Sequence, residues 1–90
     1  MLTRKVVVGD QRGIHLTPAV KIAEKALEFQ SVIMIRAEGK HVDAKQMFAL
    51  LGLKALPGTE AELEADGIDE EEAIEALTEV LRKCWNASDL

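Results

Sequence analysis

The chain has 90 residues, 48% of them hydrophobic, and this length fits one compact domain spanning residues 1–90. Eleven basic and sixteen acidic residues give a formal charge of -5, which argues against a nucleic-acid binder, and the 3% aromatic content leaves no platform for stacking bases. A single cysteine excludes an internal disulfide, and no basic N-terminal patch precedes a long apolar segment. We therefore expect a cytoplasmic protein without membrane insertion.

The first half of the chain predicts a strand, a helix and a hairpin. The valine-rich stretch 2–8 is typical of a strand, and the glycines that follow it indicate a loop. From Pro18 onward, apolar residues recur at the spacing of three and four that marks one helix face. These apolar positions are Ala19, Ile22, Ala23, Ala26 and Phe29. Residues 32–37 and 40–43 flank a Glu38-Gly39 turn and predict a hairpin.

The second half predicts a short helix, a strand and a longer helix. The apolar run 46–53 favours a helix over a strand, and residues 59–66 alternate apolar residues with glutamates, which predicts a half-buried strand with a solvated acidic face. Asp69 is placed to cap a last helix, and Arg82 and Lys83 lie at its far end, where cations favour the helix dipole. The inner stripe of this helix comprises Ala73, Ile74, Leu77, Val80, Leu81 and Cys84.

The order of these elements is strand, helix, strand, strand, helix, strand, helix. Apolar helix stripes need a partner, so we expect the helices to cover one face of a four-stranded antiparallel sheet and to leave the other face polar. The predicted fold class is α+β, in the form of an open-faced β-sandwich.

His15 lies just before the predicted start of the first helix. Pro18 suits a first helical turn and pushes Thr17 towards an extended or capping conformation, which places the helix start within a residue or two of Thr17. Free N–H groups and the dipole favour an anion there, and a neutral imidazole is a nucleophile near pH 7. A lone histidine in such a loop is more often only a surface residue, so spacing alone leaves both interpretations open.

The stretch GIHLTPAVKIAEKA resembles the active-site signature of the histidine-containing phosphocarrier protein, HPr, of the sugar phosphotransferase system. The stretches EGKHVDAKQMFALLGL and DEEEAIEALTEVL match the same family in order and spacing, so the resemblance covers essentially the whole chain. It implies the open-faced sandwich that the pattern predicts independently.

The resemblance also implies a function in sugar transport. In HPr the histidine matching His15 accepts a phosphoryl group at Nδ1 from enzyme I and passes it to the EIIA component of a permease, and the proline that follows matches Pro18. The chain would therefore be a carrier with a phosphohistidine intermediate rather than a turnover enzyme. It would need no cofactor, and a monomer would best serve two partners that share one face.

Three residues near His15 bear on how well a phosphoryl group would be held. Most family members have an arginine where this chain has Thr17, which offers a hydroxyl and no charge. Arg12 is the nearest candidate to replace that charge, although a solvated loop cation is its more ordinary role. Leu16 replaces a small or polar residue and is either an apolar partner contact or turned inward.

The resemblance further assigns partner docking to the short helix. Gln46 matches the regulatory serine of Gram-positive relatives and has no hydroxyl, which predicts that the serine switch is absent. Met47, Phe48 and Leu51 match the docking surface, although core packing is the commoner role of such a stripe. Because Met47 and Phe48 are adjacent, at least one of them should be exposed.

The alternative function is an HPr-like regulatory or docking protein with weak or no phosphoryl transfer, which the replaced arginine and serine would allow. A small-ligand binding domain unrelated to phosphate is a weaker third hypothesis. His41 has no second ligand at a metal-binding spacing, and Cys84 falls on an apolar stripe, so no metal site is expected.

Overall fold

The computed structural model describes residues 1–9, 16–53 and 58–83. The described elements follow the predicted order of strands and helices. They are β1 (Leu2–Val7), α1 (Leu16–Ala26), β2 (Val32–Ala37), β3 (Lys40–Asp43), α2 (Met47–Gly52), β4 (Glu60–Asp66) and α3 (Glu70–Arg82). The predicted first helix extended to Phe29, but α1 ends at Ala26, and Phe29 packs against the core from the turn that follows.

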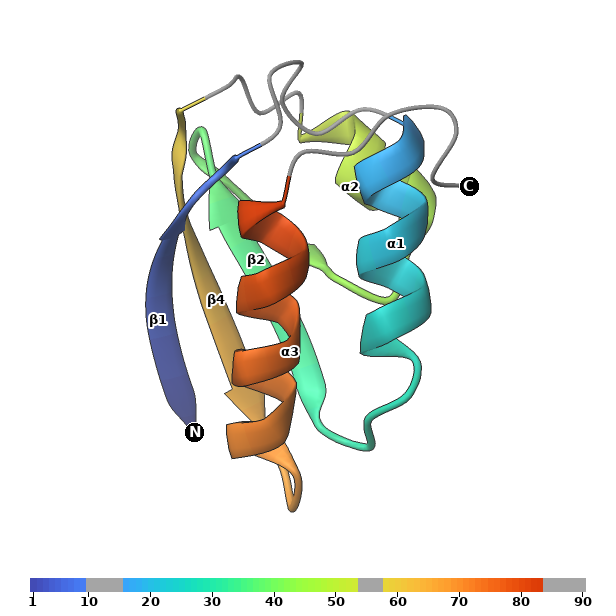
Figure 1. Ribbon diagram of the computed structural model, residues 1–90, viewed down its shortest axis with the longest axis vertical. Coiled ribbons are helices and arrows are strands. Elements are labelled where there is room, and N and C mark those ends of the chain that lie inside the picture. The colour runs from blue at the N-terminus through green and yellow to red at the C-terminus, as the bar shows by residue number, and fades with distance from the viewer. Residues whose placement is uncertain (10–15, 54–57, 84–90) are drawn as a thin grey trace.

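The four strands form one sheet in the order β1-β4-β2-β3, and every neighbouring pair is antiparallel. Helices α1 and α3 lie side by side on one face of this sheet and run in opposite directions (Figure 1). The core forms between them and the sheet, with fully buried Ile22 from α1, Leu77 from α3 and Ile35 from β2. The predicted α+β open-faced sandwich is confirmed.

Strand β4 shows how the sequence alternation divides the two faces of the sheet. Ala61, Leu63 and Ala65 are fully buried, and Leu63 lies opposite Arg4 of β1 and Ile35 of β2 in the register. Side chains of a strand point alternately to opposite faces, so the glutamates of β4 lie on the face without helices. The predicted half-buried strand is therefore confirmed.

The open face of the sheet is an ion-pair network rather than the solvated acidic face that the sequence predicted. Arg36 lies 3.6 Å from Glu62 and 3.2 Å from Glu64, and His41 Nε2 lies 3.4 Å from the same Glu64 carboxylate. The Glu64 side chain is only 14% exposed. The prediction failed because the partners of these glutamates come from β2 and β3, which are distant in sequence and become neighbours only in the sheet.

Asp69 occupies the N-cap position of α3 as predicted, but its side chain makes no capping hydrogen bond. Its carboxylate instead accepts hydrogen bonds from the backbone N–H groups of Gln30 and Ser31, at 2.8 and 2.9 Å, and from the Ser31 hydroxyl. These bonds tie the α1–β2 connection to the start of α3. Gly67 lies against the same contact, because a Cβ there would come within 2.7 Å of the Ser31 Cα atom.

We predict that Asp69→Asn lowers stability at neutral pH and that the loss disappears in acid. The Ser31 hydroxyl and then the Gln30 N–H hold the pKa of Asp69 below its usual value. A depressed pKa adds stability above the unfolded value of about 4, and this stability is lost as pH falls through the folded value. Urea midpoints of both proteins from pH 7 to pH 2 should therefore converge, and a constant difference would contradict the prediction.

Candidate functional site

One end of the molecule gathers the start of α1, the short helix α2 and the C-terminal end of α3 (Figure 1). Helix α1 packs against both α2 and α3, and its antiparallel orientation to α3 brings the first turn of one beside the last turn of the other. The start of one helix has unpaired N–H groups, and the end of another has unpaired carbonyls. This end therefore carries both unpaired N–H groups and unpaired carbonyls.

Gly9 joins the end of β1 to the last turn of α3. Its N–H donates to the Leu81 carbonyl at 3.0 Å, and a Cβ atom at this position would lie 1.9 Å from the Arg82 carbonyl oxygen. Both backbone polar groups of the preceding Val8 are hydrogen-bonded. Its N–H donates to the Thr59 carbonyl, and its own carbonyl accepts from the Gly58 N–H. The chain leaving β1 therefore passes directly against α3, and only glycine allows that approach.

Helix α1 begins at Leu16, so His15 is bonded directly to its first residue. This start lies within two residues of Thr17, as predicted, but Thr17 itself is helical, and its predicted extended or capping conformation is wrong. Pro18 costs no intrahelical hydrogen bond, because it lies in the first turn. A residue before a proline usually avoids the helical conformation. Here Pro18 and Ala19 are both buried, and this packing keeps Thr17 helical. The first turn contains no acidic residue.

Only part of the predicted phosphoryl site falls within the described residues. Arg12 and His15 lie outside them, and the side chains of Leu16 and Thr17 do as well, although both residues begin α1. Pro18 is buried in that first turn. What the structure establishes is the frame, namely the helix start that follows His15 and the glycine anchor that precedes the loop.

The predicted docking residues lie together on α2. Phe48 is 80% exposed, whereas Met47 and Leu51 are half-buried and pack against the core, so the core role holds for two of these residues and Phe48 faces the surface. Leu50 anchors the helix because its side chain is fully buried. Gln46 is the exposed N-cap residue and makes no side-chain capping bond. The adjacent pair therefore meets the expectation that one member is exposed.

The electrostatics of this surface are mild. Helix α2 contains no charged residue, and Lys40 Nζ donates to the Gly52 carbonyl at its C-terminal end, at 2.8 Å. This surface therefore has an apolar centre with Lys40 at the C-terminal end of α2, instead of a strongly basic patch.

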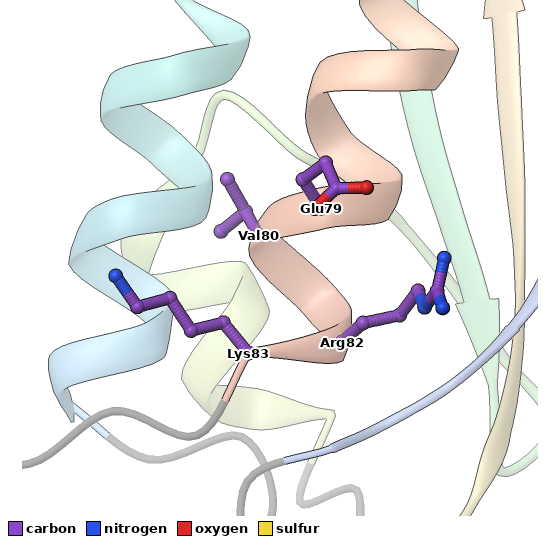
Figure 2. A pocket seen from close by; sticks show the side chains of 4 residues that line it. All are labelled: Glu79, Val80, Arg82 and Lys83. Carbon is purple, nitrogen blue, oxygen red and sulfur yellow. The ribbon is translucent and has the colours of Figure 1, made fainter.

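Sequence reasoning gave Arg82 and Lys83 only a role at the helix dipole and missed their place in this end of the fold. Both line an open pocket of about 490 Å³ together with Glu79 and Val80 (Figure 2). No sequence signal could have found this, because a pocket is a feature of tertiary packing rather than of residue spacing. Among the described residues, no cluster of three or more His, Cys, Asp or Glu side chains could hold a metal ion.

Comparison with known proteins identifies relatives that cover nearly the whole chain. The family model for the PTS HPr component phosphorylation site matches residues 2–83. Phosphocarrier protein HPr of Lysinibacillus sphaericus is 37% identical over 81 residues, covering 90% of this chain and 92% of that protein. Phosphocarrier protein HPr of Neisseria meningitidis is 33% identical, with 90% and 91% covered.

Solved structures show the same likeness. A crystal structure of HPr from Thermoanaerobacter tengcongensis superposes with a TM-score of 0.85 at 32% identity, covering 90% of this chain and 91% of that one. HPr from Bacillus anthracis gives 0.84 at 30% identity, with 89% and 95% covered. Within the ranges 1–9, 16–53 and 58–83, no helix is long and apolar enough to cross a membrane.

We predict that Gly9→Ala destabilises the fold, because its methyl group would collide with the Arg82 carbonyl. Forcing these backbones apart should cost about 1–3 kcal/mol, measured by urea unfolding. Gly52→Ala is the matched control, because nothing lies within 4 Å of its Cβ position, and it should be neutral or slightly stabilising. Equal stabilities of the two variants would contradict the anchoring role of Gly9.

Proposed function

Because the chain belongs to the HPr family of phosphocarrier proteins of the phosphotransferase system, we propose that His15 is its phosphoryl-accepting residue. An enzyme I-like protein is the proposed donor, and an EIIA-type protein is the proposed acceptor. The observation that carries the proposal is the family match over residues 2–83, which includes the stretch GIHLTPAV.

The frame around His15 suits an anion. The residue immediately precedes α1, whose dipole is positive at this end and whose first N–H groups have no intrahelical partner, apart from Pro18, which has no N–H. No carboxylate occurs in the first turn to oppose a phosphoryl group, and Lys21 is the first charged residue of the helix. These features support a phosphoryl group on His15 that is held by the backbone N–H dipoles at the start of α1 and is accessible to a partner.

The proposed transfer exchanges one phosphorus–nitrogen bond for another. The Nδ1 lone pair of neutral His15 attacks phosphorus, while its Nε2 keeps its proton. The bond to the donor imidazole breaks with its electron pair left on that ring, which carried a proton on its other nitrogen and therefore leaves neutral. His15 becomes a phosphorylated imidazolium, and the reverse arrangement passes the group to the acceptor.

The exposed part of α2 is the proposed docking surface for both partners. Phe48 projects from a helix that the buried Leu50 and Leu53 fix to the core. Because this backbone is already ordered, little conformational entropy would be lost when a partner binds the ring. Exposed aromatic residues are frequent anchors at interfaces. The half-buried Met47 beside it adds an adaptable apolar contact, which suits a surface that meets more than one partner.

We predict that His15→Ala abolishes acid-labile phosphate after incubation with phosphoenolpyruvate and the cognate enzyme I. His41→Ala is the matched control, because His41 is the other histidine of the chain and pairs with Glu64 on the far face of the sheet. It should be labelled like the parent protein. Mass spectrometry under alkaline conditions locates the adduct. Partner binding without any phosphorylation of the parent would favour the docking alternative.

We predict that Phe48→Ala raises the KM for enzyme I about tenfold, equivalent to about 1.4 kcal/mol, without lowering thermal stability. Stability should hold because the side chain is 80% exposed. Ile68→Ala is the control, since Ile68 is 89% exposed but lies in the β4–α3 connection at the opposite end of the molecule. An equal effect of both variants would remove the docking role from α2.

A further inference from the structure

The open face of the sheet carries a groove at the end where β4 leads into α3. The groove has a volume of about 200 Å³ and is lined by Met1, Val32, Met34, Glu64, Ala65 and Asp66. Val32 is 60% exposed, and Met34 on the same strand is half-buried. The groove therefore offers apolar side chains on a face that Arg36, Glu62 and Glu64 otherwise make polar.

The β4–α3 turn extends this apolar surface. Val32 lies opposite Asp66 in the sheet register, and Gly67 lies against Ser31, the residue before Val32. Ile68 follows in the turn and is 89% exposed. Figure 1 places this turn and the start of β2 at one end of the molecule, away from the start of α1. Val32 and Ile68 are thus two exposed apolar side chains at the same end, and such groups often mark a binding surface.

The negative charge of the chain is concentrated at this end. Residues 27–32 and 66–72, which the hydrogen bonds of Asp69 hold together, contain six acidic residues and no basic one. Ten of the sixteen acidic residues and all eleven basic residues therefore lie elsewhere in the sequence. Glu71 and Glu72 are exposed, and neither pairs with a basic side chain in the part of the chain that the structure describes. Such a surface attracts a cationic partner and repels a second copy of itself.

The contacts of Met1 show the chemistry that this surface accepts. The Met1 ammonium group lies 3.1 Å from a carboxylate oxygen of Glu70 and 3.8 Å from Asp66, while the same residue lines the groove. An apolar side chain next to an ammonium group therefore fits here. The Asp66 side chain is still 70% exposed, so it is open to a further cation from outside.

We propose that this end of the sheet docks a protein segment that presents an apolar side chain flanked by basic residues. The apolar side chain enters the groove against Val32 and Met34, and the basic residues face Asp66 and the exposed glutamates at the start of α3. The surface lies away from the start of α1, so this partner leaves that end of the molecule free for another protein. The inference goes beyond the proposed function and does not depend on it.

The test uses a short peptide with blocked ends, in which one leucine is flanked by two lysines on each side. Titrated into isotope-labelled protein, this peptide should shift the amide NMR resonances of Val32, Ala65 and Ile68, with a dissociation constant of about 1 mM. That strength is expected for one apolar contact and a few exposed ion pairs. Replacing the leucine by alanine should weaken binding, and replacing the lysines by glutamates should abolish it.

Two exposed valines on the same face provide a matched pair of variants. Val32→Thr should weaken peptide binding about fourfold, as expected for the loss of one apolar contact. Val7→Thr is the control, because Val7 is 54% exposed and lies opposite Glu60 at the other end of β4, outside the groove. Asp66→Asn should weaken binding about twofold, and less at high salt. All three variants should melt close to the parent protein, because the replaced side chains are exposed.

Several results would overturn the inference. Shifts centred on α2, or equal weakening by Val32→Thr and Val7→Thr, would remove the partner from this groove. Shifts of the same resonances when the protein concentration alone is raised would make a second copy the occupant. Shifts with vesicles of zwitterionic lipid and none with the peptide would assign the surface to a membrane. The titrations use unphosphorylated protein, so a failure here leaves the proposal for His15 standing, and a protein that is never phosphorylated still tests the groove.

Discussion

The burial of one sheet face beneath two antiparallel helices is the constraint on which the rest of this structure depends. Ile22, Ile35 and Leu77 are fully buried where α1, β2 and α3 meet, and removing such apolar surface from water is the main favourable term in folding. Two polar contacts fix the ends of the layer. The Asp69 carboxylate holds the α1–β2 connection to the start of α3, and Gly9 is bonded to the last turn of α3.

This packing explains why the site lies where it does. Antiparallel helices place the N–H-rich start of α1 next to the end of α3, and α2 packs against α1 at the same end. An anion-favouring helix start and the exposed apolar side chain of Phe48 thus share one end of the molecule. The proposed function would use that arrangement, because each proposed partner would have to reach His15 while it binds at the same end. The proposed transfer would leave the core unchanged, since it uses no buried group.

Element type could be predicted well because periodicity is local. The alternation in β4 and the three-and-four spacing in α3 each reflect which side chains face the core, and both were confirmed, although Cys84 of the predicted α3 stripe lies outside the described residues. The failures involved competition between local bias and distant contacts. Thr17 was expected to leave the helix before Pro18, but burial of Pro18 keeps it helical, and Asp69 was expected to cap α3, but its carboxylate accepts from Ser31 instead.

The sequence by itself determined the fold class, the histidine placed immediately before a helix and the family resemblance, because these depend on residue type and spacing along the chain. Tertiary structure alone decided that Glu64 meets Arg36 and His41, that Gly9 touches the Arg82 carbonyl and that Lys83 faces α1. The physical reason is that each of these contacts joins different elements. Their distances follow from sheet register and helix packing, and both of these depend on all the contacts of the core together.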